Sequence, residues 1–262
     1  MKKNETLETM LSSLNLLAIR DNYKKITEQA TKQNLSYGAY LEELIKAEIE
    51  EKQNKRITKL LLEAKLPRDK LLIDFDIKRI PTLHPGIIDN LKEGDFIDRY
   101  ENILIFGNPG TGKTHLAIAL GREWCIQGRK CLFISAANLV QQLLITKNKL
   151  RLEMYIKKLD KFDVLIIDDI SYIPHSKAES DVLFILLSER YEQRSMVITS
   201  NLVFSKWDQV FKDKMTTAAA IDRLVHHATI LELNADSFRM QAAKINQRFF
   251  TKDTTIKNKT RG

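Results

Sequence analysis

The pattern of apolar and polar positions changes at Asn102. From there on, short apolar runs with the length of buried strands alternate with stretches whose apolar residues recur at helical spacing. This alternation is typical of a parallel sheet covered by helices, so we predict an α/β fold with a five-stranded parallel sheet. The predicted strands are Asn102–Phe106, Lys130–Ser135, Val164–Asp168, Met196–Thr199 and Thr229–Leu233, and the predicted helices are His115–Gln127, Asn138–Thr146, Leu150–Leu159, Glu179–Tyr191, Trp207–Phe211 and Ala218–Val225.

Residues 1–66 follow a helical pattern throughout, with one glycine and no proline. Apolar residues recur at helical spacing over residues 7–17. Ser36 is a suitable cap for a long second helix, which Pro67 ends because proline lacks the backbone donor that a helix interior requires. We therefore predict a small all-α N-terminal domain over residues 1–66, which precedes the sheet and binds DNA or a partner.

The end of this long helix is rich in cations, which we expect to face solvent. Two interpretations remain open. Either the cations bind a DNA backbone, or they form an ordinary solvated helix face, and the sequence favours neither. The cations are Lys52, Lys55, Arg56 and Lys59.

The stretch Gly107–Thr114 reads Gly-Asn-Pro-Gly-Thr-Gly-Lys-Thr and fits the phosphate-binding pattern G-x-x-x-x-G-K-T. It follows a predicted buried strand and precedes a predicted helix, which is the context that this loop requires. A chance glycine-rich turn does not account for the agreement of strand, loop, lysine and helix. The pattern predicts binding of a nucleoside triphosphate.

Each residue type in this loop has a physical role. Glycines allow the backbone to turn its N–H groups towards phosphate oxygens, and the following helix adds its positive dipole end. Lys113 is expected to reach the β- and γ-phosphates, and the Thr114 hydroxyl to ligate magnesium, which prefers oxygen. The residues assigned to nucleotide binding are Gly107, Asn108, Pro109, Gly110, Thr111, Gly112, Lys113, Thr114 and His115.

Two carboxylates end the predicted strand Val164–Asp168, and a polar side chain follows the next strand. Ligands of α/β proteins bind at this carboxyl edge of the sheet. We assign magnesium binding to Asp168, and orientation and deprotonation of the attacking water to Asp169. Asn201 is a candidate for holding that water near the γ-phosphate, although a turn residue after a strand explains it equally well.

Residues 67–101 are interpreted as a connector, because prolines and glycines interrupt regular structure there. Leu71–Ile73 and Phe75 are apolar enough to dock on the sheet domain. We expect the segment Leu91–Ile97, just before the first strand, to cover the base of the nucleotide. The interrupting residues are Pro67, Pro81, Pro85, Gly86 and Gly94.

Arg223 is the cation of a small and apolar helix, Ala218–Val225. In an oligomeric ATPase, such an arginine can reach the γ-phosphate bound to the neighbouring subunit. On the sequence alone, a surface pair with Asp222 is the simpler explanation. His226 and His227 follow, but adjacent histidines on a helix point in different directions and no third ligand is spaced to complete a metal site, so we interpret them as structural.

The formal net charge is +8, which favours an anionic partner such as nucleic acid. Charge alone fits a soluble basic protein equally well. The excess is concentrated beyond Phe238, where seven basic residues accompany a single acid, Asp253. We predict a basic C-terminal helix or tail over residues 239–262. Its basic residues are Arg239, Lys244, Arg248, Lys252, Lys257, Lys259 and Arg261.

Membrane insertion and secretion are not indicated. The apolar runs fall short of the roughly 20 residues of a membrane span, and the polar N-terminus lacks a signal-peptide core. Cys125 and Cys131 form neither a metal pattern nor a disulfide pattern. We therefore expect a cytoplasmic protein without a membrane partner.

Several motifs together resemble the IstB-like family of ATP-binding proteins, which are bacterial helpers of insertion-sequence transposition. The phosphate loop alone is shared by many ATPases, whereas the combination is much more specific. The resemblance extends over most of the chain, and its motifs are Gly107–Ala117, Asp168-Asp169, Arg190-Tyr191-Glu192, Thr199-Ser200-Asn201, Asp222–His227 and Ser237-Phe238-Arg239.

The resemblance implies an AAA+ ATPase domain over residues 102–238 that is similar to the helicase loader DnaC. It also implies a partner transposase, assembly on DNA, and Arg223 as a finger between subunits, and it favours Asn201 as a site residue. Asn108 stands where the family often has proline. Asp169 stands where many AAA+ proteins have glutamate, so slow turnover is expected. Arg239 is implied to matter, in ATP sensing or in DNA contact.

Our leading hypothesis is an ATP- and Mg²⁺-dependent AAA+ ATPase that self-associates into a ring or spiral on double-stranded DNA, without sequence preference, and assists a cognate transposase. The alternatives are a DnaC-like replicative helicase loader and a non-catalytic scaffold that ATP switches. The residues assigned to catalysis are Lys113, Asp169, Asn201 and Arg223, and those assigned to the metal are Thr114 and Asp168.

Overall fold

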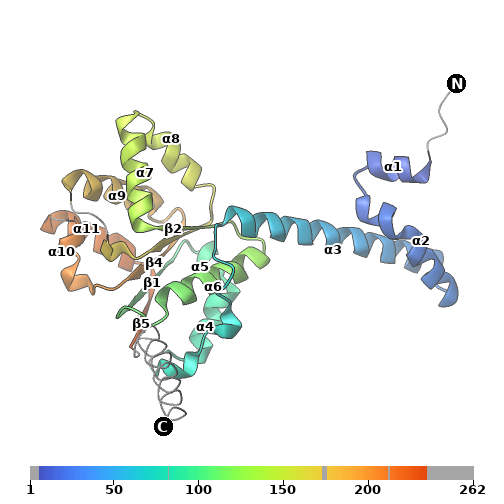
Figure 1. Cartoon of the computed structure of the whole chain (residues 1–262), viewed down its shortest axis with the longest axis horizontal. Helices are drawn as coiled ribbons and strands as arrows, with labels where there is room; N and C mark the ends of the chain where they lie inside the picture. Colours follow the sequence, from blue (N-terminus) through green and yellow to red (C-terminus); the bar gives the residue numbers. More distant parts are fainter. Residues whose placement is uncertain (1–5, 82, 173–175, 212, 235–262) are drawn as a thin grey trace, which may run out of the picture. The chain divides into compact units, whose positions relative to one another are not determined.

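The computed structural model describes residues 6–81, 83–172, 176–211 and 213–234. The chain divides into two compact units, Met1–Lys59 and Leu60–Gly262, and the boundary falls inside helix α3 (Tyr37–Glu63). All strands of the described residues lie in the second unit (Figure 1). The predicted basic segment 239–262, with Arg239, lies outside the described residues.

The first unit is helical, as its apolar spacing predicts. Helices α1 (Leu7–Ser13) and α2 (Leu17–Lys32) precede α3, and a turn with Asn15 in the left-handed region separates α1 from α2. Small and aliphatic side chains fill the space between the helices. The buried apolar residues of this unit are Ala18, Ile19, Ala30 and Leu44.

The N-terminus of α2 is capped by a residue of another helix. Leu16, which precedes α2, has no side-chain oxygen for the free N–H groups of the first turn. Instead, the Glu48 carboxylate of α3 accepts hydrogen bonds from the N–H groups of Ala18 and Ile19, at 2.8 and 3.1 Å. Burial acts to raise the pKa of Glu48, but these N–H groups and the Lys52 ammonium outweigh burial and lower that pKa. The ionised carboxylate thus joins α2 to α3.

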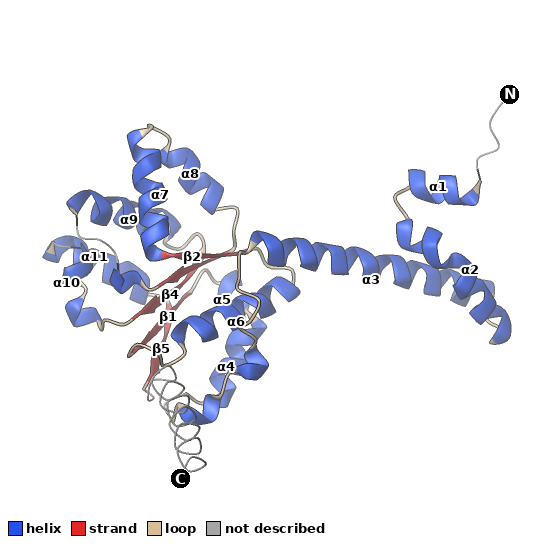
Figure 2. Cartoon of the chain, in the orientation of Figure 1, coloured by secondary structure: helices blue, strands red, loops and turns tan. Residues whose placement is uncertain are grey.

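The second unit is built on a five-stranded parallel sheet, which confirms the predicted fold class. The strand order is β2-β3-β4-β1-β5, and each neighbouring pair is parallel (Figure 2). Every predicted strand agrees with an observed one to within one residue at either end. The strands are β1 (Asn102–Gly107), β2 (Cys131–Ser135), β3 (Val164–Asp168), β4 (Ser195–Ser200) and β5 (Ala228–Leu233).

Helices bury both faces of this sheet (Figure 1). In β1, Ile103 and Ile105 belong to one core, and Leu104 and Phe106 belong to the other. Burial on both sides explains why the strands appear as continuous apolar runs in the sequence. Helix α6 (Lys113–Ile126) covers the first core, and the second is covered by α7 (Ala136–Asn148), α8 (Leu152–Leu159), α9 (Lys177–Arg190), α10 (Asp208–Phe211) and α11 (Lys214–Val225).

The connector contains more regular structure than its prolines and glycines suggested. Pro85–Glu93 form α4, and Asp95–Asp98 form α5. Pro85 begins α4 instead of interrupting it, because the first position of a helix needs no backbone donor. The His84 ring accepts a hydrogen bond from the N–H of Gly86 and so caps the same end. Single turns of 3-10 helix come earlier, at η1 (Leu72–Asp74) and η2 (Ile77–Arg79).

A guanidinium group is buried where β3 and β4 begin. Arg190, the last residue of α9, is 0% exposed. It donates hydrogen bonds of 3.0–3.2 Å to three backbone carbonyl oxygens, those of Leu159, Phe162 and Ser195. Burial lowers the pKa of Arg190 to about 10, so the group stays charged at neutral pH. The cation therefore ties the end of α9 to the segments that lead into both strands.

Across the described parts of both units, the helices are either too short or too polar to cross a membrane.

We expect Glu48→Gln to weaken the link between α2 and α3 by about 1 kcal/mol, as the loss of a helix cap does. Hydrogen exchange over residues 17–32, measured by mass spectrometry on the full chain, reports this change. Because the pKa of folded Glu48 is lowered, its contribution is complete above the ordinary value of 4.5 and is lost as the pH falls through the folded pKa. Exchange in the variant and in the native protein should therefore converge in acid.

Glu51→Gln is the matched control. Glu51 pairs with Lys55 one turn later, as Glu48 pairs with Lys52, but its side chain is 46% exposed where that of Glu48 is 8% exposed. This control should leave exchange of α2 unchanged. Equal protection of α2 in Glu48→Gln and in the native protein at neutral pH would rule out the cap.

Candidate active site

The phosphate-binding loop joins β1 to α6, and two of its positions require glycine. Gly107 has a φ of +151°, and a Cβ atom there would lie 2.5 Å from the carbonyl oxygen of Leu233 in β5. Gly112 has a φ of +100°, and a Cβ atom there would lie 3.1 Å from the Phe75 ring. Both the backbone conformation and the available space exclude larger residues. The loop is thus held between β5 and the connector.

The start of α6 completes a site for an anion. Gly112 precedes the helix and has no side chain to bond its first N–H groups, so these groups are available to phosphate oxygens. Thr111 is buried, and its hydroxyl donates to the carbonyl oxygen of Asn108 at 3.0 Å, which fixes the shape of the loop from inside. Pro109 and Gly110 line the adjoining pocket. The conformation therefore suits the role that the sequence predicts.

The Lys113 ammonium group is held by three oxygen atoms. Its Nζ donates to the carbonyl oxygens of Gly107 and Asn108 at 2.8 and 2.9 Å. It also donates to Oδ1 of Asn201 at 2.6 Å. Lys113 is 7% exposed, and a cation so buried requires acceptors of this kind. Asn201, at the end of β4, therefore lies directly beside the loop lysine.

Asp168 connects three elements at the carboxyl edge of the sheet. Its Oδ1 accepts a hydrogen bond from the Thr114 hydroxyl at 2.8 Å and another from the Thr199 hydroxyl at 2.7 Å. Thr199 in turn accepts a hydrogen bond from the N–H of Asp169 at 2.8 Å. Thr199 belongs to the Thr199-Ser200-Asn201 motif, but the sequence analysis assigned it no role. The oxygens of Thr114 and Asp168 are hard ligands, so these residues fit the magnesium ion predicted for them.

Asp169 is held from two sides. Its φ is +59°, in the left-handed region that aspartate tolerates better than most residues. Nδ2 of Asn201 donates to both carboxylate oxygens of Asp169 at 3.1 Å, and the Ser171 hydroxyl donates to Oδ1 at 2.5 Å. Ser171 also accepts a hydrogen bond from the N–H of Asn201. Asp169, Asn201 and Ser171 are thus joined to one another by hydrogen bonds. Ser171 was not among the predicted site residues.

Eight of the predicted site residues line one pocket, and the connector supplies a further wall. The expectation that Leu91–Ile97 covers the base is wrong, because the apolar residues of that segment are buried in the core. An earlier part of the connector faces the pocket instead. The lining residues are Lys70, Asp74, Phe75 and Asp76 from the connector, Pro109, Gly110, Gly112, Lys113, Thr114 and His115 from the loop and α6, and Asp169, Thr199 and Asn201 from the sheet edge.

His115 fastens this wall to α6. Its Nε2 lies 2.8 Å from the carbonyl oxygen of Leu71, and its ring meets the Phe75 ring edge-on, with centroids 5.6 Å apart. The apolar residues Leu71 and Phe75 thus dock the connector on the loop region. His115 contributes to the pocket both directly and by positioning Phe75.

Arg223 stands apart from the pocket, on α11. Its guanidinium donates to the Ser188 hydroxyl at 2.7 Å and lies over the Phe184 ring, 4.8 Å from the centroid. Both partners belong to α9. Arg223 therefore contacts another helix, and these contacts differ from the expected surface pair with Asp222. Of the residues assigned to catalysis, the structure brings Lys113, Asp169 and Asn201 together and places Arg223 elsewhere.

Comparison with known proteins gives matches over most of the chain. The sequence model of the IstB-like ATP-binding protein family matches residues 9–246. An insertion sequence ATP-binding protein of Sinorhizobium fredii is 41% identical over 238 residues, which are 90% of this chain and 80% of that protein. The ATP-binding protein of insertion sequence IS21 from Pseudomonas aeruginosa is 35% identical over 95% of this chain and 94% of its own length.

Solved structures share the fold of the second unit. A DNA replication initiation factor matches with a TM-score of 0.56 and 22% identity, over 71% of this chain and 56% of that one. AMPPCP-bound DnaA from Aquifex aeolicus matches with a TM-score of 0.55 and 21% identity, over 70% of this chain and 56% of that one. The chain therefore spans little more than half of these structures. Together with the family match, this shared fold agrees with the predicted AAA+ P-loop fold class.

Proposed function

Because this chain belongs to the IstB-like ATP-binding protein family, we propose that it is an ATPase that assembles on double-stranded DNA and assists a transposase. The family and the AAA+ fold confirm that it is an ATPase. The names of its insertion-sequence relatives support the link to transposition. Magnesium dependence, self-association into a ring or spiral, DNA binding and transposase contact are parts of the proposal.

One observation carries the proposal, namely the meeting of a loop cation, two carboxylates and an amide at one sheet edge. Asn201 bonds Lys113 at 2.6 Å and also bonds both oxygens of Asp169. Asp168 bonds the Thr114 hydroxyl at 2.8 Å. Hydrolysis of a triphosphate needs a phosphate cradle with acidic groups placed beside it, because positioning and electrostatics supply most of the catalysis.

Binding of ATP is proposed to begin with an exchange of partners at Lys113. The ammonium group leaves Asn201 and the loop carbonyls for the β- and γ-phosphate oxygens, which carry full negative charge. The N–H groups at the start of α6 bind the same phosphates. This exchange frees the side-chain oxygen of Asn201, so occupation of the phosphate site is communicated to the catalytic side of the pocket.

Asp169 is proposed as the general base. Its carboxylate accepts a proton from the water that attacks the γ-phosphate, and Asn201 positions that water. Ser171 and Asn201 both donate to Oδ1, whereas Oδ2 accepts from Asn201 and is proposed to face the water. Magnesium held by Thr114 and Asp168 would neutralise charge on the phosphate oxygens.

Arg223 is proposed to act on the site of a neighbouring subunit. It does not line the pocket of its own chain, and its side chain lies over α9. A guanidinium supplied by a neighbour stabilises the charge that develops on the transferred phosphoryl group. Turnover would then require association of subunits. This role makes the ring or spiral part of the mechanism.

DNA binding is proposed to rest on charge. The net charge of +8 suits contact with the phosphate backbone, which carries no sequence information. ATP binding closes neighbouring subunits around the duplex, and the DNA so held recruits the transposase. A DnaC-like helicase loader and an ATP-switched scaffold without turnover are the alternatives that the experiments below separate.

Lys113→Ala should abolish ATP binding, because the phosphate charge loses its main cation. Asp169→Asn should bind ATP normally and lower turnover by about 10²–10⁴-fold, since asparagine cannot accept the proton. Binding of a fluorescent ATP analogue and release of phosphate measure the two effects separately.

The exposed Lys130, directly before β2, provides a control, and Lys130→Ala should change neither property. Normal turnover in Asp169→Asn would show that Asp169 is not the base. ATP binding by the native protein on DNA without phosphate release would favour the scaffold.

Arg223→Ala and Asp169→Asn should each be inactive alone and should recover activity when mixed. In the mixed assembly, a subunit with intact Asp169 can receive Arg223 from its neighbour. Random mixing of equal amounts yields such a pair at about a quarter of the interfaces, so about a quarter of native turnover is expected. Phosphate release per subunit measures it.

Lys214→Ala, which removes an exposed cation from the same helix, is the control and should keep native turnover. Inactive mixtures, together with normal assembly, would mean that Arg223 acts within its own chain. Native turnover in Arg223→Ala alone would remove it from the mechanism.

The function is tested by particle size on random-sequence DNA, with and without ATP and magnesium. Large ATP-dependent assemblies are expected on duplex DNA, and they should weaken steeply as salt rises. Analytical ultracentrifugation on duplexes and on single strands of equal length measures this. Lys113→Ala should remain small on both.

Assembly on single strands alone would favour the helicase loader. Absence of assembly on either DNA would contradict the proposal, whatever the ATPase measurements show. Addition of the cognate transposase to ATP-bound assemblies then tests recruitment, which should fail with Lys113→Ala.

A further inference from the structure

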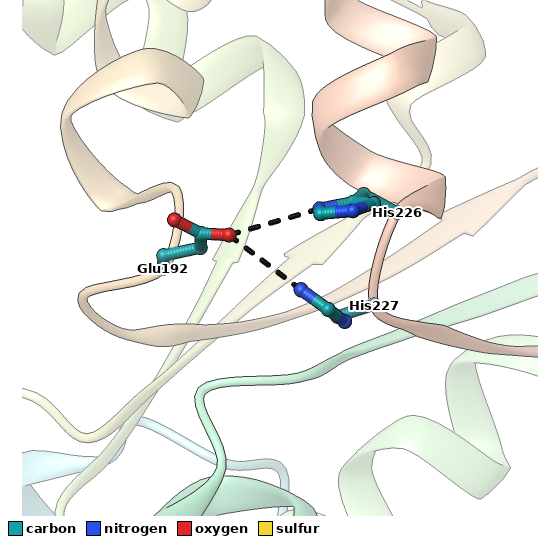
Figure 3. A group of neighbouring side chains, drawn as sticks. All are labelled: Glu192, His226 and His227. Carbon is teal, nitrogen blue, oxygen red and sulfur yellow. Dashed lines mark ion pairs between the residues drawn. The ribbon is translucent and has the colours of Figure 1, made fainter.

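A second cluster of polar side chains lies away from the ATP pocket. Glu192 stands in the turn between α9 and β4, His226 directly follows α11, and His227 precedes β5. Figure 3 shows the carboxylate and the two imidazole rings pointing toward one another. The third partner of the histidines could not be recognised from spacing, because Glu192 belongs to a different element.

The three side chains present their ligand atoms to a common point. Oε1 of Glu192 lies 3.7 Å from Nδ1 of His226 and 3.5 Å from Nε2 of His227. All three atoms lie within 4.8 Å of one another. The imidazole rings are neighbours, with centroids 4.0 Å apart. Adjacent histidines on a straight helix would point apart, but here α11 ends at Val225, before both histidines, and their ring nitrogens converge.

These distances suit a small transition-metal ion. Zinc binds histidine nitrogen and carboxylate oxygen at about 2.0–2.2 Å, so its tetrahedral ligands lie about 3.3 Å apart. The observed separations from Glu192 need to shorten by only a few tenths of an ångström. All three residues are exposed, so side-chain movement and entry of the ion meet little resistance. The nitrogen ligands favour zinc-like ions over magnesium.

We propose that Glu192, His226 and His227 form a site for a divalent transition-metal ion such as Zn²⁺, with solvent at the fourth position. The donor set has two histidines and one carboxylate, a combination that binds zinc with one open position. The site is separate from the ATP pocket, because it lies where strands β4 and β5 begin and the pocket lies at the opposite edge of the sheet.

The backbone at Glu192 supports a role for its side chain. Its φ is +56°, the left-handed conformation that usually carries glycine or asparagine after a helix. Glutamate is uncommon in that conformation, and backbone strain of this kind concentrates at functional positions. The conformation directs the carboxylate back to the end of α11. A residue with no side-chain role at this position would more naturally be glycine.

Two neighbouring groups bear on the site. The Tyr191 hydroxyl lies 2.7 Å from Nδ1 of His226, so this hydrogen bond must open when the nitrogen binds a metal. Glu101 is engaged by Arg99 through hydrogen bonds of 2.7 and 2.9 Å, and it is therefore not counted as a ligand. Tyr191 is thus the group that competes with the metal.

A bound ion would link the turn after α9 to the end of α11. The same two helices are already joined by the hydrogen bond between Ser188 and Arg223. Arg223 lies one turn before His226, so the ion would restrain the end of the helix that carries the arginine. The metal site itself does not depend on the proposed function.

The test is isothermal titration of the untagged, full-length protein with ZnCl₂, after treatment with a chelator and its removal. We expect saturable binding of one ion per chain. His227→Ala and Glu192→Gln should each weaken it about tenfold or more, as loss of a ligand does. Tyr191→Phe should tighten binding, because it removes the competing hydroxyl. A tenfold excess of Mg²⁺ should not displace the ion.

His84→Ala is the matched control, since it removes an exposed histidine from another part of the chain and should leave zinc binding unchanged. Native affinity in both His227→Ala and Glu192→Gln, or failure of the native protein to reach saturation, would overturn the proposal. Glu192→Gln and Tyr191→Phe preserve size and shape, so they decide the matter if His227→Ala does not fold. Substitution of Co²⁺ gives an independent readout, because four-coordinate cobalt absorbs visible light and a loosely associated ion does not.

Discussion

Burial of the Lys113 ammonium group is the constraint on which the ATP site depends. A cation that is 7% exposed must be surrounded by acceptors, and here the acceptors are two loop carbonyls and Asn201. Asn201 in turn holds Asp169 through both carboxylate oxygens. One charge requirement therefore sets the loop conformation, the end of β4 and the orientation of an acid from β3. The arrangement needs little reorganisation when a phosphate replaces the protein oxygens.

The same physical rule fixes the opposite edge of the sheet. Arg190 is fully buried, and its two terminal nitrogens donate to backbone carbonyls where β3 and β4 begin. Removing one partner of a buried charge costs several kcal/mol, so such a contact tolerates few alternatives. The two strands that end in or lead to Asp168, Asp169 and Asn201 are thus positioned at one end by a guanidinium and at the other by an ammonium. Apolar packing stabilises the sheet, and the two cations, Arg190 and Lys113, hold the opposite ends of these strands in place.

Sequence reasoning succeeded where residue type and spacing determine geometry locally. The loop from Gly107 to Thr114 and the acids after β3 are such cases, and apolar runs marked every strand. It failed where contacts depend on the fold. Docking of Phe75 on the sheet domain was expected, but its contact with Gly112 was not. Ser171 meets Asp169 in a tight turn without a recognisable motif, and Glu192, itself in the left-handed region, meets histidines from another element. Pro85 was misleading because proline both ends and begins helices.

The contacts of Arg223 with Ser188 and Phe184 have an energetic consequence. A hydrogen bond and a stacked aromatic ring together hold the guanidinium with about 2 kcal/mol, or roughly a thirtyfold preference for its resting position. A neighbouring subunit must offer more than this before the arginine changes partners. Loose encounters between subunits then leave it in place, and only a well-formed interface withdraws it. Isolated subunits would accordingly hydrolyse little ATP, and hydrolysis would be confined to the assembled state.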